Sequence, residues 1–212
     1  MPRKPRIALG GQIYHVLNRA AGKHHLFRTL EDYAAFERIV EEALQRSTMR
    51  ILAYCLMPNH WHFLLWPECN GDLQKFVQWL TATHARRWNT AHQRVGHGAV
   101  YQSRFKSIPV SSDAHLQRVW RYVERNALRA NLVERAEKWR WSSLWHRLHQ
   151  GALLTAGPYP LPANWVELVN QPQTQTELQD VRKHVTTGIP YGVGGWPQQR
   201  KRGRPRVYDT YK

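Results

Sequence analysis

The sequence predicts an α+β protein built around an antiparallel sheet, and two observations support this fold class. Short runs rich in β-formers alternate with segments whose apolar residues recur at helical spacing, in the order strand, helix, strand, strand, helix, strand, helix. A tight turn joins the second and third predicted strands, which makes them a hairpin. With 42 % hydrophobic residues among 212, the chain has enough apolar side chains to bury a core.

The first strand and the first helix follow from local signals near the N-terminus. Two glycines precede residues 13–17, a short run rich in β-formers that we interpret as a strand. Thr29 is placed as the N-cap of a helix, because Asp32 stands three positions later and apolar residues follow at helical spacing. We expect this helix to end near Ser47.

Residues 49–66 are interpreted as the hairpin of two strands. Pro58 and Asn59 suit the centre of its turn, because proline fixes φ and asparagine tolerates a positive φ. Gly71 then precedes a second helix with one apolar face, and residues 100–110 are a fourth strand candidate.

A third helix is expected to begin at Ser112 and Asp113, with an apolar stripe that extends to Ala130. A short helix closes this core near residue 150, and a linker punctuated by glycine and proline follows. The expected organisation is a core domain at 1–150, a small C-terminal extension at 151–195 and a basic tail at 196–212.

The charge of the chain predicts a polyanionic partner. Lys and Arg number 31 against 15 Asp and Glu, which gives a formal net charge of +16. No apolar run reaches the length of a membrane span, and two cysteines are too few for a disulfide framework. Membrane proteins and secreted cystine scaffolds are therefore excluded, and we expect a cytoplasmic protein.

Basic residues at the two ends of the chain are candidate contacts to nucleic acid. The tail contains an Arg-Gly-Arg-Pro sequence that is similar to the core of an AT-hook, which can lie in a narrow minor groove. The alternative is a solvated basic tail that adds affinity only by counterion release. The candidate residues are Arg3, Lys4, Arg6, Arg202, Gly203, Arg204 and Pro205.

Two histidines at the start of the second hairpin strand are candidate metal ligands. His60 and His62 are two residues apart, so on a strand they point to the same face while Trp61 points to the other. Two neutral imidazoles suit a divalent transition-type metal and leave coordination positions for oxygen ligands. A bare His-x-His pair is more often two surface or core histidines that happen to alternate, so the metal hypothesis requires a third ligand.

The third predicted helix offers a further ligand and a nucleophile. Tyr122 and Asn126 lie one helical turn apart, beside the apolar stripe. An amide oxygen can bind Mg²⁺ or Mn²⁺, and a tyrosine oxygen can act as a covalent nucleophile. Spacing alone favours a half-buried tyrosine at a helix edge and an asparagine near a helix end, and Tyr14, Tyr54 and Tyr101 remain competing candidates.

Five ordered motifs resemble those of the REP-associated tyrosine transposases, a family of single-tyrosine HUH transposases in which two histidines flank a hydrophobic residue. The resemblance spans residues 11–145, and residues 188–192 with the basic tail resemble the C-terminal extension of some members. The motifs are GQIYHVLNR at 11–19, YCLMPNHWH at 54–62, YQSRFKS at 101–107, RYVERNA at 121–127 and WSS at 141–143.

The resemblance implies a ferredoxin-like HUH domain that binds single-stranded and hairpin DNA at REP-like palindromes and cuts it in bacterial DNA transposition and recombination. His60, His62 and Asn126 would hold Mg²⁺ or Mn²⁺, and Tyr122 would be the nucleophile that forms a 5′-phosphotyrosine. Ala127 stands where the family often has proline, and alanine continues a helix more smoothly.

The resemblance also bears on partners. Arg104 and Lys106 fall within a matched motif and are expected to contact DNA. Because one chain would supply both the ligands and the nucleophile, action as a monomer is permitted. The expected location is the cytoplasm, in association with the nucleoid.

Two other functions remain as alternatives at this stage. The chain could be a DNA- or RNA-binding protein that keeps the fold but catalyses no reaction. Loss of activity would be expected to remove at least one site residue, and the intact set argues against it: His60, His62, Tyr122 and Asn126. A rolling-circle initiator or relaxase shares the histidine pair, but initiators usually place lysine where Arg125 stands, and no P-loop motif is present.

Overall fold

The computed structural model describes residues 8–110 and 113–187, and within them four antiparallel strands form one sheet in the order β2-β3-β1-β4. Helix α1 follows the first strand and helix α2 follows the hairpin, so the chain order βαββαβ is the ferredoxin-like one. The predicted α+β fold class is confirmed. The elements are β1 (Ile13–Arg19), α1 (Leu30–Arg46), β2 (Met49–Met57), β3 (His60–Pro67), α2 (Asp72–Ala91) and β4 (Lys106–Val110).

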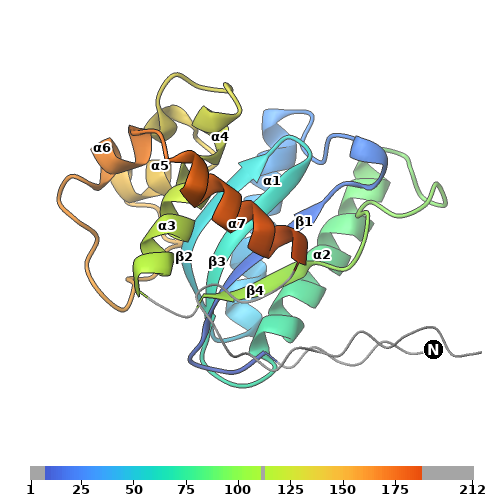
Figure 1. The fold of residues 1–212 in the computed structure, drawn as a ribbon. Coiled ribbons are helices and arrows are strands. Elements are labelled where there is room, and N and C mark those ends of the chain that lie inside the picture. The colour runs from blue at the N-terminus through green and yellow to red at the C-terminus, as the bar shows by residue number, and fades with distance from the viewer. Residues whose placement is uncertain (1–7, 111–112, 188–212) are drawn as a thin grey trace, which may run out of the picture.

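Helices cover both faces of this sheet, as Figure 1 shows, with α3 and α7 in front and α1 and α2 behind. Among the helices of the described part of the chain, none is long and apolar enough to cross a membrane. The remaining elements are η1 (Ala21–Lys23), α3 (Asp113–Glu124), α4 (Asn126–Arg129), η2 (Ala136–Lys138), α5 (Ser143–Leu148), α6 (Trp165–Asn170) and α7 (Gln175–Thr187).

Side-chain alternation along the strands divides the interior into two cores. Trp61, Phe63 and Leu65 of β3 pack into the core beneath α1 and α2. Leu64, on the other face, packs into the core that includes residues of α3, α6 and α7. Because the side chains of successive strand residues point to opposite faces of the sheet, His62 shares the face of Leu64 and lies towards α3.

The local signals for α1 and for the hairpin are confirmed. Thr29 caps α1 through a capping box, in which its Oγ1 accepts from the Asp32 amide at 3.3 Å and its own amide donates to Asp32 Oδ2 at 3.1 Å. The helix ends at its C-cap, Ser47. Met57 pairs with His60 across the two-residue turn at Pro58 and Asn59.

The fourth strand is shorter than predicted and begins at Lys106. Tyr101 makes an isolated bridge with Ala20, and its hydroxyl turns into the core. There it accepts from Trp61 Nε1 at 3.1 Å and lies 2.7 Å from His84 Nδ1. Residues 100–102 still pair with the end of β1, because the Ala21 amide donates to the Val100 carbonyl oxygen and the Gln102 amide to that of Arg19, each at 2.9 Å. The chain then bends before β4 begins.

The third helix is interrupted, where the sequence predicts one continuous helix. Helix α3 ends at Glu124 and α4 begins at Asn126, although the backbone between them stays close to helical. The side chain of the intervening Arg125 donates to the carbonyl oxygen of Val169 in α6 at 2.9 Å. The local sequence pattern around Arg125 does not predict this long-range contact. Of the predicted N-cap, Ser112 lies outside the described residues.

The segment after residue 150 packs onto the same molecule as far as it is described. Trp165, Val169 and Val181 are buried in the core that also contains Val119 and Trp120 of α3. The domain boundary at residue 150 stays a prediction, and the tail at 196–212 lies outside the described residues.

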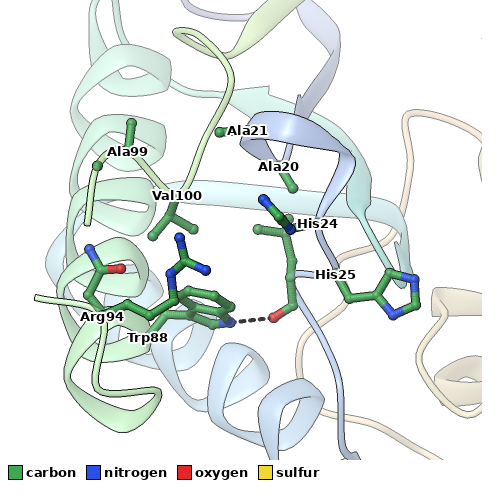
Figure 2. A pocket seen from close by; sticks show the side chains of 11 residues that line it. Ala20, Ala21, His24, His25, Trp88, Arg94, Ala99 and Val100 are labelled. Atoms are coloured by element: carbon green, nitrogen blue, oxygen red, sulfur yellow. Dashed lines mark hydrogen bonds between the residues drawn. The ribbon is translucent and has the colours of Figure 1, made fainter.

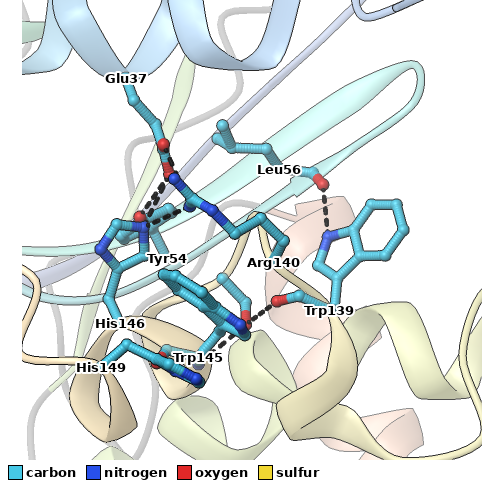
Figure 3. Close-up of polar contacts among 9 residues, drawn as sticks. Glu37, Tyr54, Leu56, Trp139, Arg140, Trp145, His146 and His149 are labelled. Carbon is cyan, nitrogen blue, oxygen red and sulfur yellow. Dashed lines mark hydrogen bonds and ion pairs between the residues drawn. The ribbon is translucent and has the colours of Figure 1, made fainter. Parts of the chain in front are cut away.

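A buried carboxylate ties α1 to the segment around α5. Glu37 Oε1 accepts from the Tyr54 hydroxyl at 2.7 Å and lies 3.0 Å from His146 Nε2, while Arg140 reaches its other oxygen at 3.4 Å (Figure 3). A charge at this depth is tolerated because it is paired and hydrogen-bonded. The network therefore fixes residues 140–146 against the first helix and the second strand.

The outer edge of β2 is covered by the chain's own backbone. The Leu56 amide donates to the carbonyl oxygen of Trp141 at 2.9 Å, and the Thr155 amide donates to that of Ile51 at 2.9 Å. The indole of Trp139 adds a bond to the Leu56 carbonyl oxygen, also at 2.9 Å. Backbone groups that a sheet edge normally exposes are thereby satisfied within the molecule.

His84, on α2, gives the fold a dependence on pH. Its imidazole is buried beside Tyr101, and burial lowers its pKa from 6.5 to about 3. Because protonation then favours the unfolded chain, its contribution to stability is complete above pH 6.5 and decreases as the pH falls towards 3. Between pH 7.5 and 5, the free energy of unfolding should fall by about 2 kcal/mol more in the wild type than in His84→Asn. Urea unfolding at both pH values measures this difference, and equal decreases would contradict it.

Candidate active site

The two predicted metal ligands lie together at the start of β3. The ring centroids of His60 and His62 are 5.0 Å apart, and the ring planes are nearly perpendicular. His60 is half-buried and its Nδ1 lies 2.6 Å from Asn59 Oδ1, whereas His62 is buried. Among the described residues, no hydrogen bond engages the Nε2 atom of either ring, so both atoms can accept a metal.

Both imidazoles are neutral at ordinary pH. Burial lowers the pKa of His60 to about 4, and the nearby Arg19 and Arg129 lower it further. Burial also holds the pKa of His62 well below 6.5, with His60, His15 and Arg129 adding to the effect. Neutral imidazole is the form that binds metal ions, so the electrostatics of the site favour ligation.

His15 on β1 is a third histidine of the site, and sequence reasoning did not select it. Its Nε2 lies 2.9 Å from His62 Nδ1, and the two rings stack with centroids 5.1 Å apart. This contact occupies the inner nitrogen of His62, which leaves Nε2 for a ligand. Side-chain alternation along β1 could have indicated the face of the sheet on which His15 lies. Only the strand pairing that sets Leu17 opposite His62 places His15 beside the two candidate metal ligands.

Tyr122 lies beside the histidine pair. It projects from α3 and is buried, with its ring centroid 5.9 Å from that of His62 and 6.0 Å from that of His15. A phenol in this position would lie close to a phosphate bound by a metal ion on the two imidazoles. The competing tyrosines pack instead with the core beneath α1 and α2, on the opposite face of the sheet: Tyr14, Tyr54 and Tyr101.

Asn126 also lies on the site's side of the sheet, as the first residue of α4. Its Oδ1 accepts from Arg129 Nη2 at 2.6 Å, while its Nδ2 is buried without a hydrogen-bond partner among the described residues. The Oδ1 atom has a second lone pair, so it can bind a metal ion while it accepts from Arg129.

The donor set fits a divalent metal ion. The described residues contain no cluster of three His, Cys, Asp or Glu side chains arranged for a metal. A site here would therefore combine the imidazoles of His60 and His62 with oxygen from the Asn126 amide and from substrate. Nitrogen and oxygen ligands of this kind suit Mn²⁺ and, with more oxygen, Mg²⁺.

Comparison with protein families decides the class of the chain. The family described as "Transposase IS200 like" matches residues 9–126, which is more than half of the sequence. The chain belongs to the IS200-like transposase family. The predicted family relationship is thereby confirmed.

A solved transposase structure shares the fold of this transposase. A REP-associated tyrosine transposase bound to a REP hairpin superposes with a TM-score of 0.57 at 16 % identity, over 82 % of this chain and 92 % of that chain. A transposase candidate from Deinococcus radiodurans R1 gives a TM-score of 0.40 at 21 % identity, over 58 % of this chain and 96 % of that chain. No curated protein sequence matches the chain significantly.

Of the residues of the transposase that are predicted to contact DNA, the described part of the chain contains Arg104 and Lys106. Arg104 is exposed in the loop before β4. Lys106 is also exposed, and its Nζ donates to the Val185 carbonyl oxygen of α7 at 3.0 Å. The basic residues at the two ends lie outside the described residues: Arg3, Lys4, Arg6, Arg202, Gly203, Arg204 and Pro205.

A small pocket beside the end of β1 is separate from this site. It lies between η1, the end of α2 and residues 98–100, and its polar lining includes His24, His25 and Arg94 (Figure 2). The Trp88 indole on its wall already donates to the Leu26 carbonyl oxygen at 2.7 Å. None of the predicted site residues lines this pocket.

Proposed function

We propose that this transposase is a metal-dependent single-strand DNA endonuclease and strand transferase that cuts hairpin DNA of the REP-like palindromic kind through a covalent Tyr122 intermediate. The observation that carries the proposal is the Tyr122 ring beside His62, within a site assembled from β1, β3, α3 and α4 of one chain. Membership in the transposase family and a fold shared with a hairpin-bound transposase support it.

The chemical step exchanges one phosphodiester bond for another. The Tyr122 oxygen attacks the phosphorus, a bond from this oxygen to phosphorus forms, and the bond between phosphorus and the 3′-oxygen breaks. The phenol proton passes to water, and the departing 3′-oxygen takes a proton from water. The products are a 5′-phosphotyrosine and a free 3′-hydroxyl, so the energy of the bond is kept for rejoining.

His60, His62 and Asn126 would hold the metal, Mg²⁺ or Mn²⁺. When bound, the ion polarises the phosphate oxygens and offsets their charge. His15 keeps the His62 ring in place from behind, through the contact at its Nδ1. The histidines project from one face of the sheet and Asn126 from α4 beside it, an arrangement that would orient the phosphate towards the nucleophile.

The positive charge of the chain supports binding of the DNA backbone. We propose that Arg104 and Lys106 contact DNA near the site, and that the N-terminal Arg3, Lys4 and Arg6 with the tail residues 202–205 add further contacts. The net charge of +16 is consistent with a large contribution from counterion release.

The test uses single-stranded hairpin oligonucleotides taken from the DNA that flanks the protein's own gene. The full-length protein, incubated with a labelled hairpin and Mn²⁺, should form an adduct that survives denaturing electrophoresis. A chelator added before the DNA should prevent formation of the adduct, because the reaction requires the metal. Hairpin binding without any adduct in Mn²⁺ or Mg²⁺ would instead assign a DNA-binding protein that lacks chemistry.

A further inference from the structure

Arg129 contacts both the proposed nucleophile and the proposed amide ligand, although no motif argument selected it. Its guanidinium carbon lies 4.0 Å from the centroid of the Tyr122 ring. Its Nη2 donates to Asn126 Oδ1 at 2.6 Å. The side chain comes from the last residue of α4, so it lies at the site because the helix continues for one turn after Asn126.

The guanidinium lacks the acceptors that neighbouring arginines have. Arg121 and Arg125 donate to backbone carbonyl oxygens of α6, and Arg147 pairs with the Glu124 carboxylate at 3.1 Å. Arg129 Nη1 is buried without a hydrogen-bond partner, and none of the ion pairs among the described residues involves Arg129. A half-buried cation whose Nη1 is buried without a counter-charge is unfavourable, so this arrangement indicates an anion that arrives from outside.

The surroundings of Arg129 are positive. Burial is the main cause that lowers its pKa, and the nearby Arg182 on α7 also lowers it. The same guanidinium depresses the pKa values of His15, His60 and His62. The cation therefore acts on the whole site, where a phosphate would be attracted by several positive groups at once.

We propose that Arg129 binds a non-bridging oxygen of the phosphate that Tyr122 attacks, and is a catalytic residue of this transposase. The proposal rests on the proposed function. Arginine presents a planar fork of donors that matches phosphate geometry. With one Nη on Asn126, the other is available to the phosphate, and its charge offsets the negative charge that gathers on the oxygens during attack.

The first experiment measures the rate of adduct formation on the hairpin used above. Arg129→Gln should lower this rate by at least about 100-fold, as expected for the loss of one transition-state donor. Arg129→Lys keeps the charge without the fork and should recover part of the loss. The matched control is Arg86→Gln, which removes an exposed arginine from α2 on the opposite face and should react at the wild-type rate. An Arg129→Gln rate within threefold of the wild type would overturn the proposal and leave the proposed function intact.

The second experiment separates phosphate binding from mere support of Tyr122 and Asn126. In the non-cleaving Tyr122→Phe background, a methylphosphonate at the mapped cleavage site removes the charge of that phosphate. This change should weaken binding about tenfold when Arg129 is present, and have little effect in Arg129→Gln. Equal weakening in both proteins would show that Arg129 has only a structural role, and would overturn the proposal.

A third measurement applies if the wild type forms no adduct with any hairpin, which would refute the proposed function itself. Inorganic phosphate is then the probe, and its ³¹P linewidth is followed as protein is added. Broadening that Arg86→Gln retains and Arg129→Gln loses would support the anion site. Equal broadening by the two variants would overturn it.

Discussion

Replacement of Tyr122 by phenylalanine is expected to abolish the covalent DNA adduct while hairpin affinity stays within about twofold. The substitution removes one oxygen and keeps the ring, so the packing against His62 and Arg129 remains. Without that oxygen no bond to phosphorus can form. Denaturing electrophoresis with a labelled hairpin measures the adduct, and fluorescence anisotropy measures affinity.

The matched control is Tyr101→Phe, which also removes one hydroxyl. That hydroxyl lies in the opposite core, where it accepts from the Trp61 indole. We expect Tyr101→Phe to lose some stability and to keep forming the adduct. The assignment of the nucleophile is wrong if Tyr122→Phe still forms adduct and Tyr101→Phe does not.

The double substitution of His60 and His62 by alanine is expected to lower adduct formation by at least about 100-fold, because loss of ligand support alone costs 10- to 100-fold. The two imidazoles are the neutral donors of the site, so Mn²⁺ binding should disappear with them. Isothermal titration with Mn²⁺ measures binding in the absence of DNA, and the adduct assay measures the consequence.

An exposed histidine provides the control for this second result. His97 lies in the loop after α2, and His97→Ala should retain both Mn²⁺ binding and the adduct. Unchanged Mn²⁺ affinity in the double variant would refute the metal site. A retained adduct in that variant would refute the role of the pair in the reaction.

Features carried by short stretches of chain could be predicted from the sequence. The capping box at Thr29 and the turn at Pro58 and Asn59 depend on neighbouring residues, so local patterns were sufficient. The strand alternation that places His60 and His62 on one face follows from the same locality. The fold class then followed from the order of these elements.

Features that depend on distant contacts could not be predicted in this way. His15 meets His62 only because β1 pairs with β3, a pairing that no local pattern specifies. Arg125, at the break between α3 and α4, contacts α6, which lies more than forty residues away along the chain. In the sequence, Arg129 is not distinguished from other helical arginines. Only the folded structure shows that its Nη1 is buried without an acceptor.

The covered edge of β2 has a consequence for the crowded interior of a cell. An open strand edge can recruit a strand from another molecule, which leads to domain swapping or to fibrous aggregates. Here the carbonyl oxygen of Trp141 and the amide of Thr155 already occupy the outward-facing groups of Leu56 and Ile51. These groups are therefore not free to pair with a strand of another molecule, so the segments around Trp141 and Thr155 oppose growth of the sheet on that side as well as completing the fold.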